Sequence, residues 1–253
     1  MFLQEPPASP WELRFRLGPF PVRVHPFFWL LALLLGQTLR EPLQLASWVG
    51  VCFVSILIHE LGHALAHRYF GYSSRIVLYS MGGLAIREGG WARRHLVNGG
   101  PRVSEWLEQV IISAAGPVAG FLLAAFVAVL VLVSHGQIVV MGSSLLSWTS
   151  PRVQLPQPAL SLVGSLLLQV NIGWGILNLM PVLPLDGGQI MRALLCRGDL
   201  WTGNRRAHLA SAVMAGVLAY ASLVLWKQTG MGVMFGYLAV NNDLALQGTG
   251  SLW

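Results

Sequence analysis

The sequence predicts a polytopic α-helical membrane protein with about six transmembrane helices and a small membrane-associated β-sheet or hairpin. Hydrophobic residues make up 55% of the 253 residues and charged residues only 10%, whereas soluble domains carry about 25% charged residues. The apolar residues occur in long blocks, which is typical of membrane-spanning segments. We therefore expect a single domain over residues 1–253, with its core spans within 26–226.

Six apolar blocks are interpreted as spans, at residues 26–39, 45–67, 110–133, 160–180, 207–226 and 231–246. The first and last have about 14 and 16 residues, so at 1.5 Å per residue they barely cross a hydrocarbon core of ~30 Å. If the N-terminus is cytoplasmic, 13 of the 16 Lys and Arg residues fall in inside segments. The positive-inside rule favours this orientation, and it explains the net charge of +6 without nucleic-acid binding. We expect an integral protein of a bacterial cell membrane with both termini in the cytoplasm.

Two segments outside these blocks favour β-structure. Residues 12–25 alternate apolar and basic side chains around a Gly-Pro turn, which predicts two short strands. Residues 75–87 contain two apolar runs separated by Gly82 and Gly83, which predicts a β-hairpin. The edge strand of such a sheet can pair with another extended chain.

The most informative polar residues are His59, Glu60 and His63, because they interrupt an apolar span with the sequence HELGH. On a helix, residues i and i+4 share a face about 6 Å apart along the axis, so both histidines can bind one ion while Glu60 lies beside it. An acidic residue deep in a span costs about 2.5–3.5 kcal/mol, which makes it a functional candidate. The alternative is that the three side chains are hydrogen-bonded to one another and to neighbours inside a helix bundle.

A zinc site needs a third protein ligand and an open position for water. His67 continues the series, but it lies about 12 Å along the helix from His59, while two zinc bonds reach only about 4 Å. We interpret His67 as a polar residue at the cytoplasmic end of the helix.

Asp186 is the better third ligand. It follows Pro181 and Pro184, which stop the preceding apolar segment from continuing as a straight helix. A broken helix at membrane depth is tolerated where it lines a wet cavity, and the charges of Asp186 and Glu60 together balance one Zn²⁺. The alternative is that Asp186 caps a short helix over 187–196.

Four motifs together resemble those of the site-2 protease family, the intramembrane zinc metalloproteases. They are HELGH at 59–63, GG at 82–83, SAAGP at 113–117 and NLMPVLPLDGG at 178–188, and the resemblance covers about 12–227. No segment corresponds to a PDZ domain between the motifs or to CBS domains after them. The chain therefore resembles the small subgroup that includes the sporulation-factor-processing proteases.

The resemblance implies a role for each matching residue. It implies that His59, His63 and Asp186 bind one Zn²⁺ per chain and that Glu60 is the catalytic base. Asn178 would hold or polarise the substrate near the scissile bond, and the hairpin would pair with an unwound substrate. We assign substrate binding to Asn178, Pro181, Pro184, Gly82 and Gly83.

These observations predict an intramembrane zinc endopeptidase that cleaves transmembrane segments in regulated intramembrane proteolysis. Its expected partners are a transmembrane protein substrate and membrane lipids; a regulatory membrane partner and the oligomeric state are left open. A membrane metal transporter is one alternative, although it should carry a second intramembrane His, Asp and Glu cluster. An inactive zinc-binding homologue is another, although all four catalytic residues are present.

Overall fold

The structure is a computed structural model that describes residues 7, 9–79, 82–88, 103–140 and 151–248. The chain divides into two compact units. The first combines residues 1–102 with 115–176, and the second combines 103–114 with 177–253.

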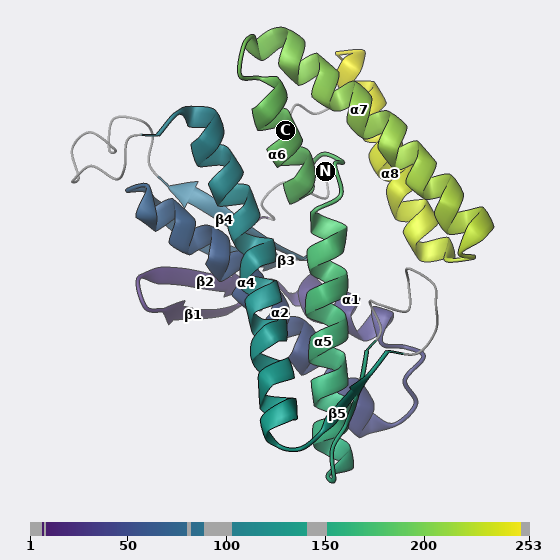
Figure 1. Ribbon diagram of the computed structural model, residues 1–253. Helices are drawn as coiled ribbons and strands as arrows, with labels where there is room; N and C mark the ends of the chain where they lie inside the picture. Colours follow the sequence, from purple (N-terminus) through teal and green to yellow (C-terminus); the bar gives the residue numbers. More distant parts are fainter. Residues whose placement is uncertain (1–6, 8, 80–81, 89–102, 141–150, 249–253) are drawn as a thin grey trace. The chain divides into compact units, whose positions relative to one another are not determined.

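The first unit contains a β-sheet, two short strands and four helical segments (Figure 1). In chain order these are β1 (Leu13–Leu17), β2 (Phe20–Val24), α1 (Pro26–Leu35), α2 (Pro42–Tyr69), β3 (Ser73–Tyr79), β4 (Gly82–Glu88), most of α4 (Glu105–Val133), β5 (Gln137–Val139), β6 (Arg152–Gln154) and most of α5 (Pro158–Asn178).

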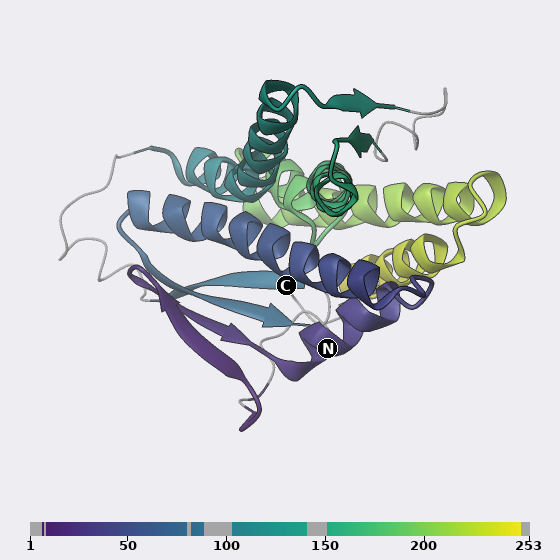
Figure 2. The ribbon, with the colours of Figure 1, turned by 90° about the horizontal axis from the view of Figure 1, so that it is seen from below.

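The strands at 12–25 and 75–87 form one sheet rather than two separate hairpins. The strand order is β1-β2-β3-β4, with β2 and β3 parallel and both outer pairs antiparallel. Helices α1 and α2 form the crossover that a parallel pair requires, and α2 lies across one face of the sheet (Figure 2). The apolar core between the helices and the sheet contains Phe20, Val22, Val24, Phe28, Ala64, Ile76 and Leu78. Strands β1 and β4 are therefore the two edges of the sheet.

Gly82 and Gly83 lie inside strand β4, not at the hairpin turn where the sequence suggested them. Gly82 is opposite Tyr79 and Gly83 is opposite Leu78 in the pairing of β4 with β3, and residues 80–81 lie outside the described part of the chain. Gly82 has φ +118°, and a Cβ there would lie 2.8 Å from the ring of Trp174 in α5. The glycine is needed because its positive φ and this close contact would strain any other residue.

Glu12 ties the start of β1 to β2. One of its carboxylate oxygens accepts a hydrogen bond from Arg23 at 2.7 Å, and the other accepts from Arg14 at 2.9 Å. These contacts, first of all the one from Arg23, hold the pKa of Glu12 at about 2, well below its usual value. The ion pair of Glu12 and Arg23 therefore holds the open end of the β1–β2 hairpin together.

Within the described residues, four helices are long and apolar enough to cross a membrane: α2, α4, α5 and the helix from Leu200 to Leu225. They correspond to four of the six predicted spans. Helix α1 has 10 residues, about 15 Å, which is half of a hydrocarbon core. Helix α8 (Thr229–Leu246) has 18 residues, but its last turns carry two Asn and one Asp. A count of six transmembrane helices is therefore not confirmed.

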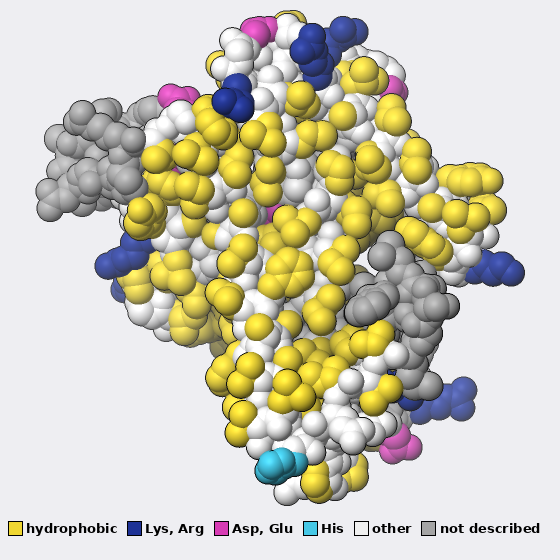
Figure 3. Space-filling view, viewed as in Figure 1, with side chains coloured by type: hydrophobic (Ala, Val, Ile, Leu, Met, Phe, Trp, Pro, Cys, Tyr) yellow, Lys and Arg dark blue, Asp and Glu magenta, His cyan; other side chains and the backbone are white. Residues whose placement is uncertain are grey.

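Exposed apolar side chains support insertion in a membrane. Large hydrophobic residues are exposed along α4, among them Leu122, Phe126 and Val133. On the face seen in Figure 3, hydrophobic side chains predominate, and the Lys and Arg side chains lie near its margins. Such a surface is far more apolar than the small patches of a soluble protein. The protein is an integral membrane protein.

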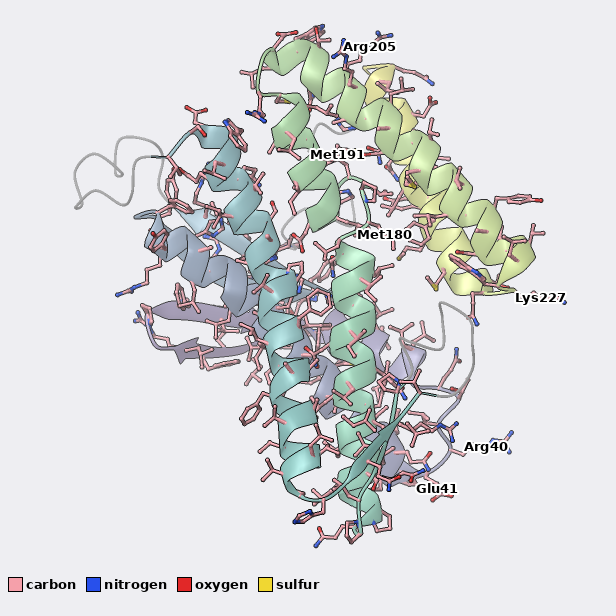
Figure 4. The ribbon with its side chains drawn as sticks, viewed as in Figure 1. Arg40, Glu41, Met180, Met191, Arg205 and Lys227 are labelled. Carbon is pink, nitrogen blue, oxygen red and sulfur yellow. The ribbon has the colours of Figure 1, made fainter. Side chains whose placement is uncertain are left out.

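The second unit contains the start of α4, α6 (Asp186–Leu195), α7 (Leu200–Tyr220), a π-helical turn (Ala221–Leu225) and α8. Helices α7 and α8 pack side by side (Figure 1). Their buried contact includes Ala215, Phe235 and Leu238, together with Val182 from the segment before α6. Arg205 and Lys227 lie at opposite ends of the helix formed by α7 and the π-helical turn (Figure 4).

Candidate metal centre

The two histidines of the HELGH sequence lie one turn apart on α2, which is an unbroken helix from Pro42 to Tyr69. Their Nε2 atoms are 3.2 Å apart, and both side chains are buried. Two nitrogens that bind one tetrahedral zinc at 2.0–2.1 Å lie about 3.3 Å from each other. His59 and His63 therefore already have the spacing that one zinc ion requires.

Glu60 lies against the first residues of strand β4. Its side chain is buried, and a Cβ at Gly83 would lie 2.6 Å from its Cδ and 2.7 Å from its Oε1. No side chain fits between the carboxyl group and the β4 backbone, so Gly83 is required for this approach. The edge strand thus begins beside the carboxylate that the sequence predicts to be the base.

A second glycine, Gly116 on α4, borders the histidine pair. A Cβ there would collide with the ring of His63 and lie 2.7 Å from Nε2 of His59. Gly62 on α2 lies against α4 in the same way. A Cβ at Gly62 would collide with the carbonyl oxygen of Ala115 and lie 2.8 Å from Cβ of Ala119. Small residues at helix contacts in membranes let the backbones approach closely.

The sequence analysis did not predict that Gly116 borders the histidine pair. The signal was present in the SAAGP motif, a small-residue stretch in an otherwise bulky apolar helix. The role of this glycine depends on which residues of another helix face it, and only the tertiary structure shows that these are His59 and His63.

Asp186 is the first residue of α6. The preceding helix α5 ends at Asn178, and residues 179–185, with Pro181 and Pro184, form an irregular segment. The residue at the N-cap position is Leu185, which makes no side-chain capping bond. The capping interpretation of Asp186 is therefore wrong, although its carboxylate does lie in the first turn, where the helix dipole favours negative charge.

Gly187 and Gly188 let α6 pack directly on this irregular segment. A Cβ at Gly187 would lie 2.6 Å from the carbonyl oxygen of Met180, and one at Gly188 would lie 2.5 Å from that of Val182. These distances exclude every side chain larger than hydrogen. The two glycines therefore keep the start of α6, and Asp186 with it, close to the loop.

His59, His63 and Asp186 form a group that can hold a metal ion, because their potential ligand atoms all lie within 4.8 Å of one another. Two imidazoles and one carboxylate are a donor set that zinc accepts, and three protein ligands leave the fourth position for water. His67 is not in this group. It lies two turns beyond His59 on the same unbroken helix, as its position in the sequence requires.

A buried polar contact joins α5 to α2 close to the histidines. The side-chain amide of Asn171 donates to Ser55 Oγ at 2.9 Å and to the carbonyl oxygen of Leu167 at 2.8 Å. Ser55 lies one turn before His59, and Asn171 lies two turns before Asn178. Such bonds between membrane helices contribute about 0.6 kcal/mol each. The role of Asn178 at the site stays a prediction.

The chain is similar to known peptidases. The sequence model of peptidase family M50 matches residues 48–221. A zinc metalloprotease of Methanocaldococcus jannaschii is 25% identical over 92% of this chain and 56% of its own length. The protein Rip3 of Mycobacterium tuberculosis is 28% identical over 88% of this chain and 54% of its own. This chain spans about half the length of these curated relatives.

The fold also resembles a solved structure, the site-2 protease from Methanocaldococcus jannaschii. The TM-score is 0.57 at 20% sequence identity, and the match covers 96% of this chain and 97% of the other. At this identity the match is evidence for the fold alone.

The ligand group predicts one zinc ion per chain in the purified protein. His59→Ala, His63→Ala and Asp186→Ala should each lose the metal, and Gly116→Ala should weaken binding because its methyl group would displace both rings. His67→Ala is the matched control on the same helix and should keep the zinc. Metal analysis after gel filtration measures the result. Zinc loss in His67→Ala together with retention in Asp186→Ala would exclude this ligand set.

Proposed function

The chain belongs to peptidase family M50, and from this premise we propose that it is an intramembrane zinc endopeptidase that cleaves transmembrane segments of membrane proteins. The observation that carries the proposal is the ligand-spaced pair His59 and His63, buried with Glu60 in a helix of membrane-spanning length. We propose that residues 1–253 act as one protease domain and that the reaction is a step of regulated intramembrane proteolysis.

Each residue of the group has a distinct task in hydrolysis. His59, His63 and Asp186 would hold zinc, which when bound polarises the scissile carbonyl and lowers the pKa of the attacking water. Glu60 accepts a proton from that water as its oxygen bonds to the carbonyl carbon. Glu60 then passes the proton to the amide nitrogen as the carbon–nitrogen bond breaks.

The edge strand β4 is suited to present the substrate. A transmembrane helix hides its carbonyl groups in its own hydrogen bonds, so it must unwind before it is cut. An unwound segment can add to a free sheet edge, and β4 is the edge whose Gly83 lies against Glu60. We propose that Gly82, Gly83 and Asn178, with the loop at Pro181 and Pro184, line the bound segment.

The distribution of basic residues supports a cytoplasmic location for both termini in a cell membrane. Arg205 belongs to the segment at the start of α7 that is rich in arginine, and Lys227 follows the other end of the same helix. The positive-inside rule places the first of these in the cytoplasm and the second outside.

A transporter and an inactive homologue would each respond differently to a substitution of Glu60. A transporter would use the group to pass zinc through the membrane, so changes at Glu60 would alter zinc flux. An inactive homologue would bind zinc, and no peptide fragment would depend on Glu60. Family membership favours the protease over the transporter, and substitution of Glu60 separates all three.

Glu60→Gln should retain zinc and lose cleavage by several orders of magnitude, because the amide cannot accept the proton of the water. Metal analysis and mass spectrometry of membrane-protein fragments, with wild type for comparison, measure both properties. Glu41→Gln is the matched control, since Glu41 is exposed at the start of the same helix. Fragments that persist unchanged in Glu60→Gln would contradict the assignment, and liposome zinc transport without cleavage would indicate the transporter.

Proline in β4 should impair cleavage without affecting zinc content. Adjacent residues of an antiparallel strand send their N–H groups to opposite sides, so either Leu84 or Ala85 offers a donor to the free edge. Of Leu84→Pro and Ala85→Pro, at least one should reduce cleavage strongly because proline lacks that donor. Arg16→Pro in the opposite edge strand β1 is the control. Normal cleavage by both β4 variants, or a selective loss in Arg16→Pro, would refute pairing at β4.

Cysteine labelling tests the orientation. In a background without Cys52 and Cys196, the free cysteines of the chain, Arg205→Cys should react with an impermeant maleimide only in inverted vesicles. Lys227→Cys should react only in right-side-out spheroplasts, because it lies beyond the other end of the helix. The reverse pattern would invert the topology.

A further inference from the structure

Two side chains, Ser211 of α7 and Asn242 of α8, bond the backbone of Leu183, three residues before Asp186, and His208 of α7 contacts Asn242. The Leu183 N–H donates to Ser211 Oγ at 3.0 Å, and the Leu183 carbonyl accepts from the side-chain amide of Asn242 at 2.8 Å. His208 Nδ1 lies 2.9 Å from Asn242 Oδ1. Both backbone polar groups of one loop residue are therefore held by residues of helices far along the chain.

Asn242 uses its full hydrogen-bonding capacity in this arrangement. Its amide nitrogen donates to the carbonyls of Leu183 and, at 2.9 Å, Leu238, and its Oδ1 accepts from His208. An amide has two N–H donors, and both are occupied. The opposite orientation would face an oxygen towards two carbonyl oxygens, so one orientation alone satisfies the site. It also requires His208 to carry a proton on Nδ1.

The cluster is closed to water. Leu183, Ser211 and Asn242 have an exposed fraction of 0%, so water cannot replace a lost bond. Beside it, Val182 packs with Ala215, Phe235 and Leu238 in an apolar cluster. The apolar contacts of Val182 hold the loop in place, but they do not fix the orientation of the Leu183 peptide groups. The hydrogen bonds to both polar groups of Leu183 define the rotation.

The path from Leu183 to Asp186 is short and internally bonded. The N–H of Leu185 donates to the carbonyl of Val182 at 2.9 Å, and the N–H of Gln189 donates to the carbonyl of Leu185 at 2.9 Å. The loop thus passes directly into the first turn of α6, where Asp186 is the first residue. A rotation of the Leu183 peptide would change where the Asp186 carboxylate points.

We propose that His208, Ser211 and Asn242 are positioning residues that orient the Asp186 ligand through the backbone of Leu183. The inference rests on the proposed function in one respect, namely that Asp186 binds zinc. Groups that orient a metal ligand without touching the metal typically change its affinity by about 10–100-fold. The cluster explains why α7 and α8 carry buried polar groups in otherwise apolar helices.

Asn242→Asp is the main test, because it keeps the size of the side chain and replaces both donors with acceptors that face carbonyl oxygens. The full chain, purified in detergent and loaded with one zinc, is mixed with excess EDTA, and zinc release is followed over time. We expect release to be faster by about tenfold or more than in wild type. Asn241→Asp is the matched control, since Asn241 is the preceding residue and its side-chain amide bonds to the carbonyl of Tyr237 in its own helix.

Two further positions keep the test decisive if Asn242→Asp does not fold. Ser211→Ala removes the partner of the Leu183 N–H and should also accelerate release. His208→Asn keeps a donor where Nδ1 lies and should release zinc nearly as slowly as wild type, whereas His208→Leu should not. Wild-type rates in both Asn242→Asp and Ser211→Ala would overturn the proposal. So would equal acceleration in Asn241→Asp, because that result indicates a general weakening of α8.

Zinc binding by the wild type tests the proposed function, whereas the release rates of the variants test the positioning role. If wild-type protein binds no zinc, the proposed function fails at once, before any variant is compared. If wild type holds zinc and the variants release it at the same rate, Asp186 is a ligand that needs no support from α7 and α8. In that case only the positioning role of His208, Ser211 and Asn242 fails.

Discussion

His59, Glu60 and His63 lie within a helix that is long enough to cross a membrane, where hydrocarbon solvates neither a charge nor an unpaired dipole. Every polar group at that depth needs a partner inside the protein or on a bound ion. The structure meets this requirement by clustering polar groups. The two imidazoles face each other at 3.2 Å, and Asp186 lies with them in the ligand group.

Close backbone approach is the means by which the site is assembled. Gly62 and Gly116 bring α2 and α4 together beside the histidines, and Gly83 brings β4 against Glu60. Farther along the chain, Gly187 and Gly188 bring α6 against the loop that precedes it. Because the side chain of glycine is a single hydrogen, the backbones of α2, α4 and β4 can lie directly beside the histidines and the Glu60 carboxyl. The site therefore depends on these glycines as well as on the candidate ligands.

The buried amides Asn171 and Asn242 serve a related purpose in the two units. Asn171 joins α5 to Ser55 one turn from His59, and Asn242 holds the carbonyl of Leu183 shortly before Asp186. Apolar packing between helices is tolerant of sliding and rotation, whereas a hydrogen bond with both partners buried is not. In each unit a buried amide thus fixes a contact that hydrophobic packing alone would leave loosely defined.

The sequence by itself determined the membrane class, four of the helices and the strand segments, and it identified His59, His63 and Asp186 as candidate metal ligands. These features depend on local quantities, namely apolar run length, alternation, proline positions and the i, i+4 spacing of one helix. Tertiary structure alone decided that the two hairpins form one sheet, that Gly83 faces Glu60 and that Gly116 faces both histidines. It also decided that Ser211 and Asn242 bond the backbone of Leu183 and that His208 contacts Asn242. Each of these contacts joins residues distant along the chain, and a single sequence carries no record of which distant residue will be opposite.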